Sequence, residues 1–323
     1  MLRAQGNFDG GPGHIDVSFR APERWTGPTA LQATSRVADT PMHATAITLG
    51  DDEAGPVLIF LRLAPGVTPP DAPAHGHASD NWRISLLGSL PMGREAYGPG
   101  EFRIQEGWKP YASDNYALGP DGGWSALLFA DRRGVRMRHV KAQETELTES
   151  NRHLAEWLGI KGDLVSDSPD DAPGPSRLVT SLDDARRAAH INSSFAEADG
   201  WLPVGADSRF AAALMGDPAR GPVLVLTRTA PGGQALSGCS FDTEGFRMVV
   251  RGSHTIDGTV YEIGDMRVDS PEARYGDVIA GDDGVDEVIL VADRRAAMPL
   301  AGAGPWADAL QAEVARLLAV GQA

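Results

Sequence analysis

An internal repeat constrains the fold of this chain more than any other feature of its 323 residues. Residues 55–66 read GPVLIFLRLAPG and residues 221–232 read GPVLVLTRTAPG, so eight of twelve positions are identical. The match continues with WRISLLGS against FRMVVRGS, with YGPGEFRI against YEIGDMRV, and with a final ADRR in both copies. Two copies of about 100 residues each indicate duplicated domains, because a solenoid unit is much shorter.

Short strands dominate the pattern inside each copy. The apolar runs are short, rich in β-branched residues and interrupted by Gly, Pro and Asp, as in VLIFLRL and WSALLFA, which is typical of β-strands. Helical periodicity occurs outside the repeated blocks and predicts three helices, at residues 145–160, 181–190 and 305–321. The sequence therefore predicts an all-β protein with two jelly-roll barrels in tandem and a few peripheral helices.

The boundary between the barrels is expected in a segment that lacks apolar periodicity. Residues 166–176 read SDSPDDAPGPS, and a composition rich in Pro, Asp and Ser is typical of an exposed linker. We therefore expect a first barrel at residues 1–165, a linker at 166–178 and a second barrel at 179–323. The exposed sheet edges of such barrels are consistent with a homodimer.

Composition and charge exclude several classes of partner. Asp and Glu number 44 against 29 Lys and Arg, and the formal charge of -15 repels phosphate backbones, so no nucleic acid is expected as a partner. No stretch approaches the ~18 apolar residues of a membrane span, and the first residues lack the apolar centre of a signal peptide. We therefore expect a cytoplasmic protein with no membrane partner. The single cysteine, Cys239, rules out thiolate-rich metal sites, so any metal needs histidine and oxygen ligands.

The first copy contains a histidine pair that suits a metal ion. His75 and His77 are two positions apart, so on a strand both imidazoles point to the same face. Neutral imidazole binds several transition metals, and two His with one carboxylate is the arrangement of non-heme iron oxygenases. Asp80 is the nearest carboxylate but has the wrong parity unless the strand bulges, whereas Asn81 has the right parity and an amide oxygen. The second copy has no His-x-His pair.

A resemblance to the cupin superfamily is carried by two stretches, HGHASDNWRISLLGS and GPGEFRIQEGWKPY. His75, His77 and Gly88 match the first cupin motif, in which Asn81 stands at the position of the usual Glu. Tyr111 stands where the second motif ends in His. The resemblance covers both repeats, and it implies two cupin-type barrels, a bicupin, with one divalent transition metal in the first barrel. The implied metal is iron, or else zinc, manganese, nickel or copper.

Arginine and aromatic side chains accompany the histidine pair. Arg83 has the parity of the histidines and can offer a bidentate fork to a substrate carboxylate. Alternatively, because the second copy has Arg247 at the matching position, this arginine pairs with an acid such as Glu101 or Asp265 to close the barrel. Tyr111 can donate a proton, stabilise an oxyanion or bind the metal. The candidates for substrate binding share a strand face or form an aromatic wall at the barrel mouth, and they are Arg103, Gln105, Trp82 and Trp108.

These residues lead to one main functional hypothesis and two alternatives. The main hypothesis is a metal-dependent bicupin enzyme that acts on a small organic acid or aromatic compound, and a non-heme dioxygenase is the preferred reaction type. His75, His77 and Asn81 would bind the metal, while Tyr111 and Arg83 would be catalytic. The first alternative is a metal-free bicupin that binds a small molecule or has a regulatory role. The second is a cupin-type lyase, isomerase or cyclase that uses Tyr111 as its acid or base.

Overall fold

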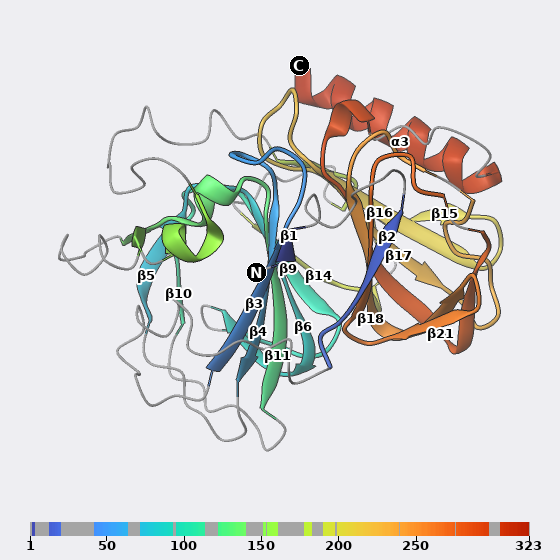
Figure 1. Ribbon diagram of the computed structural model, residues 1–323, viewed down its shortest axis with the longest axis horizontal. Coiled ribbons are helices and arrows are strands. Elements are labelled where there is room, and N and C mark those ends of the chain that lie inside the picture. The colour runs from blue at the N-terminus through green and yellow to red at the C-terminus, as the bar shows by residue number, and fades with distance from the viewer. Residues whose placement is uncertain are drawn as a thin grey trace. The chain divides into compact units, whose positions relative to one another are not determined.

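The strands of the computed structural model belong to two compact units (Figure 1). The first unit comprises Met1–Leu2, Ala21–Ser176 and Ala188–Ser193, and the second comprises Arg3–Arg20, Arg177–Arg187 and Ser194–Ala323. The structure describes residues 2–3, 13–20, 42–63, 72–92, 95–113, 122–139, 151–152, 154–160, 178–182, 190–197, 199–238, 240–274, 276–296 and 304–322.

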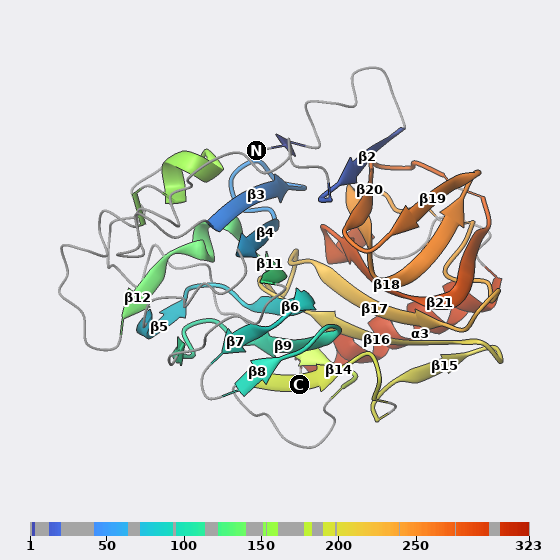
Figure 2. The same cartoon turned by 90° about the horizontal axis from the view of Figure 1, so that it is seen from below.

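The first unit is built on one large sheet and two smaller ones (Figure 2). The large sheet has seven strands in the order β1 (Leu2–Arg3), β3 (Met42–Thr48), β4 (Val57–Leu63), β11 (Gly123–Phe129), β6 (Asn81–Gly88), β9 (Glu101–Gln105) and β14 (His190–Ser194). The pairs from β3 to β9 are antiparallel. A second sheet has the order β10 (Tyr111–Ser113), β5 (Ala72–His77) and β12 (Met137–His139), and β7 (Leu90–Met92) pairs with β8 (Glu95–Tyr97).

The second unit repeats the central part of this plan in a nine-stranded sheet. Its path runs through β13 (Val179–Thr180), β16 (Ser208–Leu214), β17 (Val223–Thr229), β21 (Val278–Val291), β18 (Gly245–Ile256), β20 (Asp265–Asp269) and β2 (His14–Ser18), while β15 (Leu202–Val204) pairs with β16 and β19 (Thr259–Glu262) pairs with β18. The pairing of β18 with β21 shifts register twice along its length. Such irregularities bend a strand, so they let these two strands curve around the barrel.

The structure confirms the all-β prediction and one of the predicted helices in full. Helix α3 (Gly304–Gln322) covers the segment predicted at 305–321, and residues 151–152 and 154–158, inside the segment predicted at 145–160, are helical. The prediction of a helix at 181–190 is wrong at its ends, because residues 181–182 form a bend and His190 begins β14; residues 183–189 lie outside the described part. No helix in the described ranges has the length and apolar character needed to cross a membrane.

Two strands lie in the unit that is formed mainly by the other half of the chain. Strand β2 pairs with β20 in the second unit, and β14 takes the edge position next to β9 in the first. Apart from the short exchanged segments, the units divide between Ser176 and Arg177, within the segment 166–178, of which only Leu178 is described. Pairing at a sheet edge depends on which open strand is within reach, so these two placements have no local signal in the sequence.

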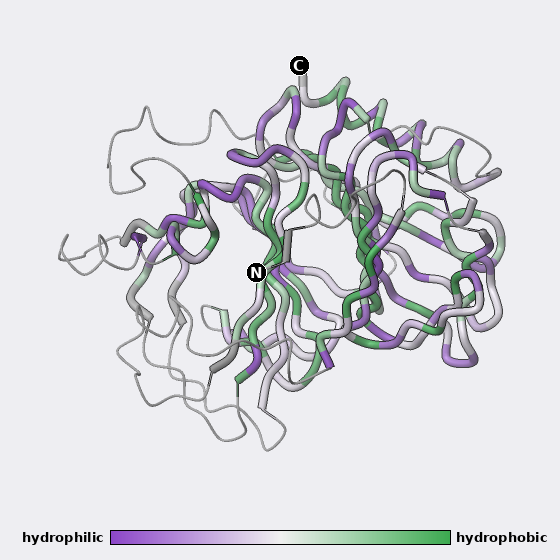
Figure 3. The backbone as a smooth tube through the Cα atoms, in the orientation of Figure 1, coloured by the Kyte–Doolittle hydropathy of each residue, from purple (hydrophilic) through white to green (hydrophobic). Residues whose placement is uncertain are grey.

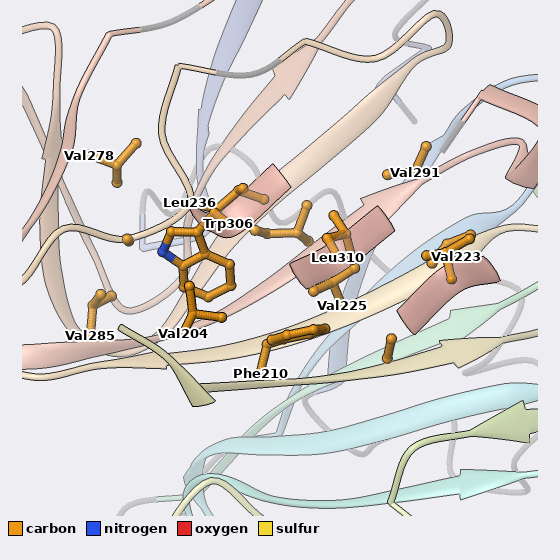
Figure 4. Packing of buried hydrophobic residues seen from close by; sticks show 14 of the residues in the cluster. Val204, Phe210, Val223, Val225, Leu236, Val278, Val285, Val291, Trp306 and Leu310 are labelled. Atoms are coloured by element: carbon orange, nitrogen blue, oxygen red, sulfur yellow. The ribbon is translucent and has the colours of Figure 1, made fainter. Parts of the chain in front are cut away.

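Hydrophobic residues concentrate along the central strands (Figure 3). In the second unit, one buried cluster joins the sheet to α3, whose Trp306 and Leu310 lie against Phe210 and Val225 (Figure 4). The rings of Trp306 and Phe210 are 5.8 Å apart between centroids, and the indole nitrogen donates to the carbonyl oxygen of Gln234. The helix thus covers one face of the second sheet. In the first unit, the residues that are helical at 154–158 contribute to the equivalent cluster.

A buried arginine explains why two separate blocks of the repeat match. Arg132 donates to the carbonyl oxygens of Leu49, at 2.9 Å, and Asp51, at 2.7 Å, and Arg294 donates in the same way to Met215 and, at 3.0 Å, to Gly221. The arginine comes from the ADRR block and the carbonyl groups from the loop before the other block. A Cβ at Gly221 would lie 2.0 Å from the Met215 oxygen. In each copy the ADRR block therefore contacts the start of the GPVL block, which explains why both blocks match between the copies.

Replacing Arg294 with methionine is expected to lower the free energy of unfolding of the second unit by about 3 kcal/mol. The buried carbonyl groups of Met215 and Gly221 would lose their donor, and each unsatisfied buried group costs ~1–3 kcal/mol. Urea denaturation followed by circular dichroism measures the change. Arg295→Met is the matched control, because Arg295 is exposed and its ion pair is with Asp293. An equal loss in both variants would contradict the explanation.

Candidate functional site

Strand β5, which carries the histidine pair, is the middle strand of the three-stranded sheet. Tyr111 faces His75 across β10 and β5, and Met137 faces His77 across β12 and β5. Both imidazole rings are buried, and their centroids are 5.4 Å apart. The register of β10 therefore places the Tyr111 ring next to the histidine pair, with 4.4 Å between the centroids of Tyr111 and His75.

Three side-chain atoms converge at this site. Nε2 of His75 lies 2.7 Å from the hydroxyl oxygen of Tyr111, and Nε2 of His77 lies 3.2 Å from the same oxygen. Two nitrogens and one oxygen of the kinds that bind transition metals thus share one small region. The described residues contain no group of three His, Cys, Asp or Glu side chains that could hold a metal, so the third candidate donor is a phenol.

A backbone contact fixes the orientation and tautomer of His77. Its Nδ1 lies 2.8 Å from the carbonyl oxygen of Val135, and because a carbonyl can only accept, Nδ1 carries the hydrogen. The lone pair of neutral His77 is then on Nε2, which points at Tyr111. The Phe129 ring packs against His77 with 4.8 Å between centroids. His77 is therefore held with its lone pair directed to the point of convergence.

The hydroxyl group of Tyr111 can donate its single hydrogen to only one of the two histidines. Since Nε2 of His77 accepts, the consistent arrangement is donation from His75 Nε2 to the hydroxyl oxygen and from the hydroxyl to His77 Nε2. The three groups then form a directed chain that ends at the Val135 carbonyl oxygen. Such a chain can move a proton between its two ends.

A buried cation covers the ring of Tyr111. The guanidinium carbon of Arg83 lies 3.9 Å from the ring centroid, and Arg83 is only 3% exposed. Its Nε and Nη2 have no hydrogen-bond partner, and no ion pair joins Arg83 to a carboxylate in the described ranges. Burial lowers the pKa of Arg83, which the neighbouring Tyr111 opposes and Arg103 reinforces. Burial raises the pKa of the Tyr111 hydroxyl, and the positive charges of Arg83 and Arg103 act against this rise.

A second buried arginine lies beside the first. Arg103 faces Arg83 directly across β9 and β6, and like charges in that position are normally destabilising. Arg103 donates to the hydroxyl oxygen of Tyr97 at 2.7 Å and to Asn192 at 2.9 Å. Its nearest described carboxylate, Glu95, is 3.6 Å away and 58% exposed. The face of the sheet next to Tyr111 therefore holds two buried positive charges and little negative charge.

Asn81 and Gln105 lie on the strand face of Arg83 and face each other. The Asn81 amide nitrogen donates to the Ser79 carbonyl oxygen at 3.2 Å, and its buried Oδ1 has no hydrogen-bond partner. Gln105 donates to the carbonyl oxygen of Lys109 at 2.6 Å. Asn81 therefore keeps one acceptor atom that the described protein does not use, whereas the amide nitrogen of Gln105 is engaged in a turn.

The two tryptophans predicted to bind substrate have different positions. Trp82 is fully buried and packs near Phe102. Side chains alternate along β6, so Trp82 points to the face opposite Arg83. Its ring belongs to the buried core. Trp108 is 36% exposed in a left-handed turn with φ of 62°. Its backbone nitrogen donates to the His77 carbonyl oxygen, which places it beside the site.

The alternative acids proposed for the arginines are not their partners. Glu101 is exposed and accepts from the backbone nitrogen of Gly98 at 2.6 Å, and Asp265 accepts from Arg20 at 2.7 Å. Arg247, the equivalent of Arg83 in the second unit, instead lies 3.3 Å from Glu287. Sequence reasoning missed Glu287, which directly precedes the apolar run VILV at residues 288–291.

A buried network surrounds Glu287 in the second unit. His254, which the spacing of histidines had not singled out, lies 2.7 Å from the carboxylate, and Thr227 donates to it at 3.1 Å. Burial raises the pKa of Glu287, but the charges of Arg247 and His254 and these hydrogen bonds lower it more, to about 2. The second barrel therefore holds an ionised carboxylate in the interior, paired with its own arginine.

No protein-family model matches the sequence, and no curated protein matches it. Solved structures match its fold. A candidate dioxygenase from Nostoc punctiforme is 12% identical, with a TM-score of 0.51 over 87% of this chain and 83% of that chain. A variant of oxalate decarboxylase from Bacillus subtilis is 13% identical, with a TM-score of 0.46 over 86% and 77%. A candidate glyoxylate-induced protein from Pseudomonas aeruginosa is 11% identical, with a TM-score of 0.49 over 87% and 88%.

The first of these matches carries the argument about the fold. It covers 87% of this chain and so extends over both repeats, whose strands follow the same order around β4, β11 and β6 as around β17, β21 and β18. Together with the two motif stretches around His75 and Tyr111, these observations agree on one architecture. The chain has a duplicated cupin-type fold.

Proposed function

We propose that this bicupin is a metal-dependent enzyme that acts on a small organic acid in its first barrel, in the first place as a dioxygenase. The observation that carries this proposal is the convergence of His75 Nε2 and His77 Nε2 on the hydroxyl of Tyr111, beside the buried guanidinium of Arg83. Donor atoms for a metal ion thus adjoin a cation suited to a carboxylate.

The donor atoms fit a transition-metal ion. Two imidazole nitrogens and a phenol oxygen suit iron, zinc, manganese, nickel or copper. The contact of His77 Nδ1 with the Val135 carbonyl oxygen is of the kind that orients metal-binding histidines. Asn81 Oδ1, which is buried without a hydrogen-bond partner, is a candidate for a further ligand. When bound, such an ion supplies Lewis acidity or a redox centre for the reaction.

The chain's own residues have distinct tasks in this proposal. Arg83 binds and orients the substrate carboxylate, and Arg103 adds a second positive charge on the same strand face. Where Tyr111 is not itself a metal ligand, its hydroxyl oxygen holds a proton that it can donate to the substrate. The two arginines lower the pKa of Tyr111 against the effect of burial, so they favour this transfer.

Metal analysis of purified protein tests the proposal. We expect about one transition-metal ion per chain in the wild type, because three protein ligands are enough for an open catalytic site, and almost none in His77→Ala. His14→Ala is the matched control, since His14 is a partly exposed histidine of the second unit that lies 3.7 Å from Asp16. A wild-type protein that contains no metal after growth in medium supplemented with each candidate metal would contradict the proposal.

The metal-free binding protein stays as a second candidate because one observation favours it. His75, Tyr111 and His77 satisfy one another through hydrogen bonds without any ion. In that case small acids would raise the melting temperature by mass action, and a chelator would leave this rise unchanged. Loss of the rise after chelation would favour the enzyme.

A further inference from the structure

The two barrels differ in how the positive charge of their buried arginines is neutralised. In the second barrel, Arg247 lies 3.3 Å from Glu287, and Arg267 lies 2.8 Å from Asp269. In the first barrel, Arg83 is equally buried and forms no ion pair with the described residues. An unpaired buried cation costs considerable free energy, so the difference needs a physical reason.

Strand register identifies the residue that replaces Glu287. Across β18 and β21, Glu287 faces Val249, two positions beyond the buried arginine of β18. Across β6 and β11, Ser125 faces Ser85, two positions beyond Arg83. Ser125 is therefore on the same diagonal to Arg83 as Glu287 is to Arg247, and it is 3% exposed. Where the second barrel has a carboxylate, the first has a side chain that ends at its hydroxyl group.

The second counter-charge is also absent from the first barrel. Gln105 and Asp269 are the last residues of the equivalent strands β9 and β20. Gln105 is neutral and donates to the Lys109 carbonyl oxygen, so it does not neutralise Arg103. The only carboxylate paired with Arg103 in the described part of the chain is the exposed Glu95. Glu287 and Asp269 of the second barrel thus have neutral replacements in the first, Ser125 and Gln105.

The neighbours of the missing carboxylate have become apolar. Thr227 and His254 contact the carboxylate of the second barrel. Leu61, which faces Ser125 across β4 and β11, takes the position of Thr227, and Leu90 takes the position of His254 in the matched segments WRISLLGSL and FRMVVRGSH. The position next to Arg83 thus has neither the acid nor the polar side chains that surround Arg247. Such a position suits an anion with an apolar body.

We propose that a ligand carboxylate pairs with Arg83 in the place that the Glu287 side chain fills beside Arg247, and that Ser125 is the specificity residue that leaves this place open. The second barrel carries a built-in carboxylate, so it needs no ligand for charge balance. The ligand class is a small monocarboxylate with an apolar body. This inference rests on the proposed function only in identifying that ligand with the substrate of the enzyme.

The test introduces the carboxylate of the second barrel into the first. Acetate, propionate and benzoate serve as probes, with chloride at equal ionic strength as the blank, and the rise in melting temperature measures binding. The wild type and Ser125→Ala should bind the best probe alike, because both leave the place open. Ser125→Glu should bind it more than about tenfold more weakly. Unchanged binding in Ser125→Glu would overturn the proposal.

A comparison of two variants distinguishes the effect of side-chain size at position 125 from the effect of an ion pair with Arg83. Ser125→Glu and Ser125→Gln have side chains of nearly the same size, but only glutamate neutralises Arg83. The glutamate variant should melt at least about 4 °C higher than the glutamine variant, and this difference should disappear when both are combined with Arg83→Met. A glutamate variant that is no more stable than the glutamine variant, or that fails to fold, would overturn the proposal.

Metal content distinguishes a failure of this inference from a failure of the proposed function. Ser125→Glu leaves His75, His77 and Tyr111 in place, so it should contain as much metal as the wild type. If the wild type lacks metal but Ser125→Glu abolishes binding of the probes, the enzyme proposal fails and the carboxylate site stands. If metal is present and Ser125→Glu binds the probes normally, the carboxylate site fails and the enzyme proposal stands.

Discussion

Replacing Glu287 with glutamine is expected to lower the free energy of unfolding of the second unit by about 3–5 kcal/mol. The carboxylate is fully buried and lies within 3.3 Å of Arg247 and within 2.7 Å of His254. Glutamine keeps the size of the side chain but leaves the arginine without its counter-charge. Urea denaturation followed separately in each unit measures the loss, because two units need not unfold in one transition.

Glu262→Gln is the matched control for this change. Glu262 also pairs with an arginine in the second unit, Arg20, but its side chain is 52% exposed. Exposed pairs contribute at most ~1 kcal/mol. Equal losses in the two variants would show that the burial of Glu287 has no energetic consequence, which contradicts the account of the network.

Acid dependence gives the same prediction an independent readout. The pKa of Glu287 is about 2 in the folded protein, below its ordinary value of 4.5, so the unfolded state binds the proton first as the pH falls. The stabilisation from its ionised carboxylate is therefore complete above about pH 4.5 and is lost as the pH falls towards 2. The difference in stability between the wild type and Glu287→Gln should shrink over that interval, and a constant difference would contradict the assignment.

The fold could be predicted from the sequence because its signals are local and occur twice. Alternating apolar residues, turn residues and the match between the copies each predict strands, and together they exclude most other architectures. The amphipathic pattern at 305–321 likewise predicted helix α3 (Gly304–Gln322). The edge strands β2 and β14 could not be placed in this way. Their sequences are strand-like, but the choice of a pairing partner depends on the completed sheets.

The same distinction applies to the candidate site. Parity on one strand predicted that His75 and His77 share a face, and the motif resemblance indicated Tyr111. Parity also argues against Trp82 as a neighbour of the site, since it precedes Arg83 by one position and so points to the other face. The pairing of Arg247 with Glu287 could not be predicted from the sequence, because the two residues are diagonal neighbours on strands that are far apart in the chain.

Replacing Arg83 with methionine is expected to abolish binding of carboxylate ligands while it raises the stability of the first unit. The guanidinium is buried, its Nε and Nη2 have no hydrogen-bond partner, and Arg103 faces it directly. Methionine fills similar space without a charge, so the free energy of unfolding should rise by about 1–2 kcal/mol. Binding of a small acid should weaken by about 100-fold or more, since the loss of a charge-assisted contact is large in a buried site.

Arg103→Met is the matched control, because this arginine has the same charge and strand face but donates to Tyr97 and Asn192. Its replacement should therefore destabilise the first unit. Arg83→Met should also raise the pKa of Tyr111, since the Arg83 charge lowers it, and ultraviolet titration of the phenol measures that shift against the Tyr111→Phe variant. If Arg83→Met destabilised the protein as much as Arg103→Met and left acid binding intact, Arg83 would be a structural residue. A gain in stability coupled to a loss of binding is the result expected of a residue whose partner is the ligand.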